Sequence, residues 1–209
     1  MIKINDILEC EKYFSDVDAV IFDLDDTLYS EKDYVRSGYI AVSRKFPEVE
    51  NMAEKLWSAF EQKLPAIDFV LEKEGLLSDG SKAEAIEAYR FQTPEISLYP
   101  GVRELLIRLK ETKKLGLITD GRPEGQRAKI EALGIADLFD SIVVTDELGG
   151  AEFRKPCVRA FEITKERLGV SFEKMIYVGD NAKKDFIAPE KLGMQSCHFQ
   201  NPDGLYFGK

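Results

Sequence analysis

The feature that most constrains the fold is a helix stop that recurs three times in the second half of the chain. Each time, a segment with helical periodicity ends in Leu-Gly followed by an apolar residue, at Leu133-Gly134, Leu168-Gly169 and Leu192-Gly193. Glycine suits the left-handed backbone conformation just past a helix C-terminus. A short apolar run follows each stop, so the pattern predicts that helices and strands alternate in this part of the chain.

Five short apolar runs are predicted to be strands, and they cover residues 19–25, 115–119, 141–145, 175–179 and 196–199. Their apolar residues are consecutive rather than alternating, which is typical of strands covered on both faces in a parallel sheet. Strands that alternate with helices form right-handed βαβ units. The sequence therefore predicts an α/β fold with a doubly wound, Rossmann-like parallel sheet of five strands. Pro123 and Pro156 are expected in the first turns of two of the helices.

Residues 31–96 interrupt this alternation. They contain no strand-like run, and their apolar residues recur at helical spacing, as in Val35, Tyr39, Val42 and Phe46. We therefore expect a helical insertion over residues 31–96, within an α/β core made of residues 1–30 and 97–209.

The overall charge narrows the choice of partners. The 209 residues contain 29 Lys and Arg against 38 Asp and Glu, a net charge of −9, and no basic cluster offsets this balance. Such acidity argues against nucleic acid and against anionic membranes as partners. No run of 18 apolar residues and no signal-peptide pattern occurs, which predicts a cytoplasmic protein without a membrane span. The three widely spaced cysteines are expected to be reduced thiols.

Acidic residues gather where predicted strands end. Asp23 and Asp25 lie at the end of the first strand, and Asp180 and Asp185 follow the fourth. In open α/β sheets, ligands bind outside the carboxyl ends of the strands. We therefore expect these carboxylates to lie at one site.

Complementary groups lie at the other predicted boundaries. Thr119, Asp120 and Gly121 end the second strand, and Lys155 immediately precedes Pro156 at a predicted helix start. One lysine among several carboxylates suits a magnesium-dependent phosphoryl site, because hard oxygen ligands hold the metal while the lysine neutralises further charge.

Four ordered segments carry a family resemblance: DLDDTL, LITDG, the lysine of RKP, and VGDNAKKD. Together they resemble the four motifs of the haloacid dehalogenase superfamily, in its phosphatase branch. The motifs span residues 19–185, and the insertion over residues 31–96 resembles the helical cap domain of that superfamily.

The resemblance implies a role for each motif. Asp23 would be the nucleophile that forms an aspartyl-phosphate, and Asp25 would protonate the leaving oxygen and later deprotonate the water. Thr119 would hydrogen-bond the phosphoryl group, and Lys155 would hold it beside the nucleophile, although the neighbouring Arg154 is an alternative to Lys155. Covalent catalysis of this kind splits one difficult displacement into two.

The resemblance also implies a Mg²⁺ site. Its ligands would be the side chains of Asp23 and Asp180 and the backbone carbonyl of Asp25. Asp185 would bind the metal directly or through water, or would instead be a first-turn acid favoured by the helix dipole. Asp120 and Gly121 are expected beside the substrate. Asp26 is interpreted as a carboxylate that caps the turn after the strand.

The predicted function is a magnesium-dependent phosphatase for a small phosphorylated metabolite, either a sugar phosphate or a nucleoside monophosphate. A phosphosugar mutase of the same superfamily remains an alternative, because it keeps both aspartates. A 2-haloacid dehalogenase is disfavoured, since an acid at Asp25 would have no leaving oxygen to protonate. A phosphoaspartate receiver module is disfavoured because its acceptor follows a middle strand and it has no large insertion.

Charge predicts further substrate contacts from the insertion. Four aspartates face one lysine and one divalent metal, so the site would carry a net charge of −1 before an anionic substrate arrives. We therefore expect Arg36 or Arg44 to contact the substrate, with Tyr34 and Tyr39 as neighbouring candidates.

Overall fold

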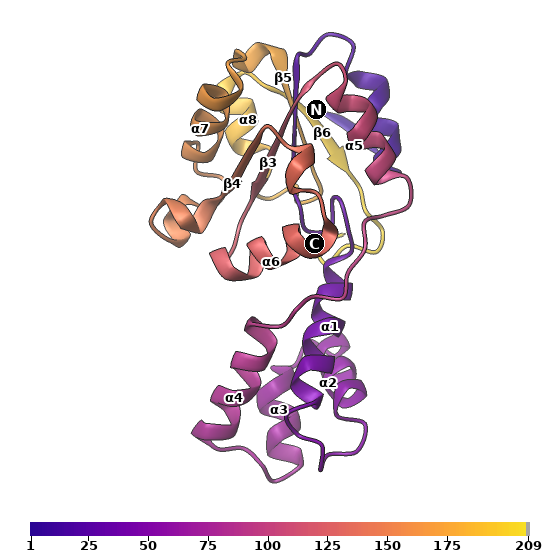
Figure 1. Ribbon diagram of the computed structural model, residues 1–209, viewed down its shortest axis with the longest axis vertical. Helices are drawn as coiled ribbons and strands as arrows, with labels where there is room; N and C mark the ends of the chain where they lie inside the picture. Colours follow the sequence, from indigo (N-terminus) through magenta and orange to yellow (C-terminus); the bar gives the residue numbers. More distant parts are fainter. Residues whose placement is uncertain (208–209) are drawn as a thin grey trace. The chain divides into compact units, whose positions relative to one another are not determined.

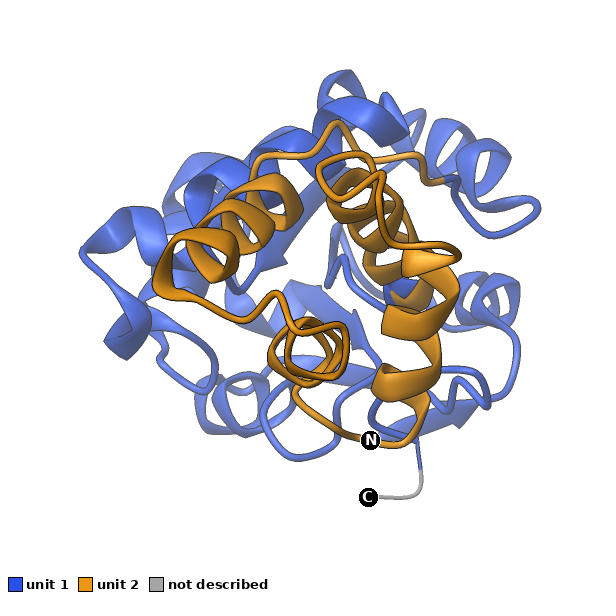
Figure 2. Ribbon diagram, turned by 90° about the horizontal axis from the view of Figure 1, so that it is seen from below, with its two compact units in different colours: residues 1–31, 97–209 blue, residues 32–96 orange. Residues whose placement is uncertain are grey.

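The computed structural model describes residues 1–207 of the chain. The chain forms two compact units, one made of residues 1–31 and those from 97 onward, the other of residues 32–96 (Figure 2). Each unit is described by itself below.

The first unit contains a parallel sheet (Figure 1). Within residues 1–207 this sheet has six strands in the order β1-β6-β5-β2-β3-β4. Their bounds are β1 Ile2–Ile4, β2 Ala19–Phe22, β3 Lys114–Thr119, β4 Ser141–Val144, β5 Met175–Gly179 and β6 Gln195–Phe199. The α/β class and the parallel sheet are confirmed, and β2 is buried along its whole length, as expected for a strand covered on both faces.

The predicted count of five strands was wrong, because β1 was missed. This strand has three residues, Ile-Lys-Ile, and pairs only with β6, through Ile2 and Cys197 among others. It lies at the edge of the sheet, so it lacks the consecutive apolar run by which the other strands were identified.

Helices cover both faces of the sheet. Four α-helices alternate with the strands: α5 Val102–Lys110, α6 Pro123–Leu133, α7 Arg159–Leu168 and α8 Ile187–Leu192. Short 3-10 helices occur as η1 Ile7–Tyr13, η2 Ala136–Leu138, η3 Thr145–Leu148, η4 Ala151–Phe153 and η5 Phe172–Lys174. One apolar cluster joins Phe161 of α7 and Ala188 of α8 to Ile21 of β2 and Tyr177 of β5. Helix α5 packs with η1 on the opposite face (Figure 1).

The recurring helix stop is confirmed. Helices α6, α7 and α8 each end at the predicted leucine, and the following Gly134, Gly169 and Gly193 have φ of 60°, 68° and 76°. The prediction that a helix begins at Pro156 was wrong. Helix α7 begins at Arg159, and the Lys155–Pro156 peptide bond is cis. Lys155 therefore lies in a loop rather than at a helix N-terminus.

The second unit is built of helices. They are α1 Glu31–Ser43, whose first residue belongs to the first unit, α2 Met52–Glu61, α3 Ala66–Lys73 and α4 Asp79–Arg90. Their core includes Val42, Leu56 and Leu71, all with no exposed surface. Val35, Tyr39 and Val42 lie in α1, so the helix predicted from their spacing is confirmed. Across residues 1–207, no helix is both long and hydrophobic enough to cross a lipid bilayer.

Candidate active site

The strand order brings the predicted site residues together. Strand β2 lies between β3 and β5, so the carboxyl ends of these three strands are neighbours. Asp23 follows β2, Thr119 is the last residue of β3, and Asp180 follows β5. A pocket of the first unit opens here, and it is lined by Asp23, Asp25, Glu31, Asp120, Arg154, Lys155, Asp180, Asn181, Lys184 and Tyr206.

Asp23 is buried beside a buried lysine. Its Oδ1 lies 2.5 Å from Nζ of Lys155, which also lies 2.9 Å from Oδ1 of Asp185 and donates to the hydroxyl of Tyr177 at 2.8 Å. Burial alone would lower the pKa of Lys155, but the carboxylates of Asp185 and Asp23 outweigh it and raise that pKa well above its usual range. The lysine is therefore a fixed cation against the predicted nucleophile, whereas Arg154 pairs with Asp146 at 2.6 Å.

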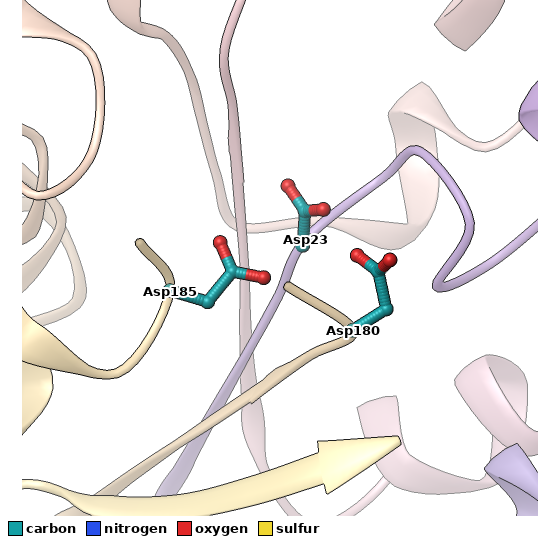
Figure 3. Close-up of side chains that lie close together, drawn as sticks. All are labelled: Asp23, Asp180 and Asp185. Atoms are coloured by element: carbon teal, nitrogen blue, oxygen red, sulfur yellow. The ribbon is translucent and has the colours of Figure 1, made fainter. Parts of the chain in front are cut away.

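Asp23 is also one of three carboxylates that lie close together. Asp23, Asp180 and Asp185 point toward one another (Figure 3), and one oxygen from each lies within 4.8 Å of the others. Burial, together with the charges of Asp23 and Asp185, raises the pKa of Asp180 to about 9. Oδ1 of Asp185 is buried, and Nζ of Lys155 lies 2.9 Å from it. A set of hard oxygen donors whose charges repel one another fits a divalent cation.

Gly179 makes room for one of these carboxylates. A Cβ at this position would lie 2.5 Å from Oδ2 of Asp185 and 3.0 Å from its Cγ. The same Oδ2 accepts a hydrogen bond from the backbone N–H of Asn181 at 2.9 Å. Asp185 therefore has a buried, fixed position in the loop before α8, and it is not a first-turn acid of a helix.

Asp25 lies beyond the end of β2, in a different environment from the other acids. Its carboxylate accepts hydrogen bonds from Nζ of Lys129 at 2.7 Å, from Nε2 of Gln126 at 2.9 Å and from the hydroxyl of Tyr29. Burial alone would raise the pKa of Asp25. The charge of Lys129 and the hydrogen bonds from Lys129, Tyr29 and Gln126 instead hold that pKa below its usual range. The Asp25 side chain is not part of the carboxylate group of Figure 3, and its predicted metal contact is through its backbone carbonyl.

Asp120 organises the loop around Lys155. Its Oδ1 accepts from the backbone N–H of Lys155 and from the hydroxyl of Thr145, both at 3.0 Å, and its Oδ2 lies 2.8 Å from Nζ of Lys184. These contacts lower its pKa against the effect of burial, with the charges of Lys155 and Lys184 contributing most. Asp120 thus tethers the loops, and its predicted contact with substrate stays a prediction.

Asp26 caps the turn that follows Asp25, as interpreted from the sequence. Its backbone has φ of 53°, and its buried carboxylate accepts from the N–H of Glu31 at 2.9 Å and from the N–H of Leu205 at 2.6 Å. The side chain of Asn201 donates to the carbonyl of Asp26 at 2.8 Å. The turn after the predicted nucleophile is therefore fixed by hydrogen bonds from a nearby residue, Glu31, and from the distant segment that contains Asn201 and Leu205.

The two arginines predicted to contact substrate belong to the second unit. The Arg36 guanidinium lies 4.1 Å from the centroid of the Trp57 ring, and Arg44 pairs with Glu95 at 3.4 Å. The charge count behind that prediction was incomplete. It left out Lys129 and Lys184, which pair with the carboxylates of Asp25 and Asp120, and it left out Asp120 itself. The count therefore does not support the substrate contact of Arg36 or Arg44, which stays a prediction.

The family model for haloacid dehalogenase-like hydrolases matches residues 17–193. The chain belongs to this family. The resemblance inferred from the four motifs is thereby confirmed, and the chain is an enzyme, a hydrolase, as predicted.

Two curated relatives cover most of the chain. The glyceraldehyde 3-phosphate phosphatase of Methanopyrus kandleri is 30% identical over 193 residues, 85% of this chain and 82% of that relative. Pyrimidine 5'-nucleotidase YjjG of Escherichia coli is 23% identical over 208 residues, 90% of each chain. Among solved structures, the HAD-hydrolase YfnB of Bacillus subtilis bound to magnesium has a TM-score of 0.65 at 19% identity, covering 87% of this chain and 86% of that one. This last likeness shows the shared fold.

Sequence reasoning missed several side chains that touch the site of this hydrolase. Gln126 and Lys129 reach Asp25 from α6, and Lys184 reaches Asp120. A signal for two of them was present, because Gln126 and Lys129 lie on the same helical stripe as the buried Ile130 and Leu133. Polar residues on an otherwise apolar, inward-facing stripe indicate a buried polar partner.

Proposed function

We propose that this hydrolase is a magnesium-dependent phosphatase that cleaves a small phosphomonoester through an aspartyl-phosphate on Asp23. One observation carries the proposal: Asp23 is buried at the end of β2, 2.5 Å from Lys155 and within 4.8 Å of the carboxylate oxygens of Asp180 and Asp185. A nucleophile between a fixed cation and a set of hard oxygen donors suits phosphoryl transfer, which depends mainly on positioning and charge stabilisation.

In the first half-reaction, a carboxylate oxygen of Asp23 attacks the phosphorus. The bond from phosphorus to the leaving oxygen breaks, and Asp25 gives that oxygen a proton. In the second half-reaction, a water oxygen attacks the phosphorus, Asp25 takes a proton from the water, and the bond to Asp23 breaks to release phosphate. Splitting the displacement in this way replaces one high barrier by two lower ones.

Two further residues hold the phosphoryl group. The Lys155 ammonium, already beside Asp23, compensates negative charge on the phosphoryl oxygens, since a fixed charge in a buried site acts with little screening. The Thr119 hydroxyl at the end of β3 donates a hydrogen bond to one of those oxygens. Both groups are buried, so neither has to give up a full water shell during the reaction.

Asp23, Asp180 and Asp185 would hold the Mg²⁺ ion, with the carbonyl of Asp25 as a further ligand. When bound, the ion supplies positive charge that attracts the phosphate dianion and offsets repulsion between the three carboxylates. The close approach of three hard oxygen donors, one from each of these aspartates, supports this assignment.

For the substrate, we propose a small phosphorylated metabolite. The two relatives are named for glyceraldehyde 3-phosphate and for pyrimidine nucleotides, which are a sugar phosphate and nucleoside phosphates. These compounds are therefore the first to assay, beside a panel of other phosphorylated metabolites.

The decisive test measures phosphate released from that panel with Mg²⁺ and after the metal is removed by EDTA. We expect release from at least one small phosphomonoester, its loss with EDTA, and its recovery when Mg²⁺ is restored. Absence of release from every compound would contradict the proposal. An isomerised phosphate ester as product would instead indicate a mutase, and halide release from a 2-haloacid would indicate a dehalogenase.

A further inference from the structure

Three side chains converge on Asp25 that the mechanism above does not use. The hydroxyl of Tyr29 and Nζ of Lys129 both donate to Oδ1, the latter at 2.7 Å, and Nε2 of Gln126 donates to Oδ2 at 2.9 Å. Tyr29, Gln126 and Lys129 are themselves buried, with 0%, 3% and 5% of their surface exposed. We call Gln126 and Lys129 the α6 clamp.

The chemistry of these donors indicates how Asp25 is held. An ammonium group and an amide N–H only donate hydrogen bonds, so both oxygens of Asp25 act as acceptors in this arrangement. Donors on both oxygens keep the carboxylate in its ionised form, which is the form that a base needs, and fix its orientation. The clamp residues are three positions apart on α6, so they reach Asp25 from adjacent turns on one helix face.

Gln126 also connects Asp25 to the phosphoryl site. Its Nε2 donates a second hydrogen bond, to Oγ1 of Thr119, the residue proposed to bind the phosphoryl group. Gly121 leaves space for this side chain: its φ is +137°, and a Cβ there would lie 3.3 Å from Cγ and Cδ of Gln126. The backbone at the end of β3 is thus shaped around a glutamine that joins Asp25 to Thr119.

We propose that Gln126 and Lys129 are positioning residues that hold Asp25 as the base of the second half-reaction. This inference rests on the proposed phosphatase function. In that half-reaction, the water oxygen bonds to phosphorus, one water proton passes to Asp25, and the phosphorus–oxygen bond to Asp23 breaks. Asp23 returns as a carboxylate, and inorganic phosphate leaves. The proton on Asp25 is then available for the leaving oxygen of the next substrate.

The two half-reactions depend differently on the clamp. With p-nitrophenyl phosphate the leaving group is a weak base and departs without a proton, so the first half-reaction does not need Asp25 in place. The second half-reaction always needs a base aimed at the water. A loosened clamp should therefore slow hydrolysis of the phosphoenzyme while leaving its formation intact.

The test uses the full chain with p-nitrophenyl phosphate and Mg²⁺, and compares wild type with Lys129→Met and Gln126→Met. We expect kcat to fall about 10- to 100-fold, as for a misplaced general base, while kcat/KM stays within about threefold. Rapid mixing should show a burst of one p-nitrophenol per site, and acid-quenched protein should carry covalent phosphate. Lys129→Arg should restore part of kcat. Lys165→Met, on the exposed surface of α7, is the matched control.

A purely structural role gives a different result. Partial unfolding lowers kcat, kcat/KM and the burst together and accumulates no phosphoenzyme, and that outcome would overturn the inference. If Lys129→Met does not fold, Gln126→Met and Lys129→Arg carry the same comparison. Unchanged kcat in these variants of an active enzyme would overturn only the clamp. Failure of the wild type to release phosphate from any phosphomonoester would overturn the proposed function itself.

Discussion

The two compact units of this hydrolase differ in whether their charged side chains are buried. The first unit buries Asp23, Lys155 and Asp185 together, with 4%, 4% and 0% of their surface exposed. In the second unit, the described buried side chains are apolar except for Ser37 and Gln92, and its ion pairs, such as Lys82–Asp68, lie on the surface. Burying charge is costly unless partners compensate it. The contrast indicates that the first unit is organised around chemistry and the second around packing.

The strongest test of this contrast is Asp23→Asn. The variant should lose at least about a hundredfold in phosphate release, because the amide is not a competent nucleophile. The fold should remain, since one of several repelling carboxylates is removed, and circular dichroism checks this. Asp79→Asn, an exposed residue at the start of α4, is the control and should keep its activity. Substantial turnover by Asp23→Asn would exclude an aspartyl-phosphate on this residue.

Removing a lysine should affect the two units unequally. Lys155→Met leaves Asp23 and Asp185 buried without their cation, so the free energy of unfolding should fall by about 3–5 kcal/mol. Lys82→Met breaks a pair whose side chains are 43% and 39% exposed, and should cost about 0–1 kcal/mol. Urea denaturation of both variants measures the difference. Equal losses would mean that burial of the Lys155 pair contributes no special stability.

Truncating a core side chain should destabilise the protein in either unit. In the second unit it should do so without changing catalysis. Leu56→Ala in the second unit and Leu105→Ala in α5 remove side chains with no exposed surface, and each should lower the free energy of unfolding by about 2–5 kcal/mol. For Leu56→Ala, kcat/KM of the folded protein toward p-nitrophenyl phosphate should not change. A loss there would show that the aryl phosphate reaction needs the second unit's packing.

The smallest expected effect concerns Arg36. Its guanidinium lies over the Trp57 ring, so Arg36→Ala should lower the free energy of unfolding by about 0.5–1 kcal/mol. Arg44→Ala, which breaks an exposed pair with Glu95, should change stability less. KM for the natural substrate tests the predicted second role. A rise in KM that is absent with p-nitrophenyl phosphate would support a substrate contact, and unchanged KM in both variants would leave these arginines structural.

The parts predicted from sequence depend on local patterns. Strands β2 to β6 follow consecutive apolar runs, and the helix stops follow glycines such as Gly134, so short windows were sufficient. The same windows placed Asp23 and Asp180 at strand ends, and the parallel order of β2 and β5 brought them together. The motif spacing and the observed fold therefore agree that Asp23 and Asp180 lie at one site.

The parts that were missed depend on packing between distant segments. Strand β1 is defined by its pairing with β6, near the other end of the sequence, and not by its own composition. Lys129 acquires a role only because α6 places it against Asp25, 104 residues earlier in the chain. Lys155 was assigned to a helix start because proline is common there, whereas the loop around it is held by Asp120.

The carboxylate of Asp26 has a consequence for the order in which the enzyme is assembled. Its bond to the N–H of Leu205 joins positions 179 residues apart, and Asn201 binds the carbonyl of the same residue. During synthesis, the turn that follows the nucleophile emerges among the first 30 residues but remains without these partners until about residue 205 has left the ribosome. Contacts of such long sequence separation form late. A nascent chain that already carries all four motifs is thus expected to stay inactive until the segment around Asn201 and Leu205 closes the turn.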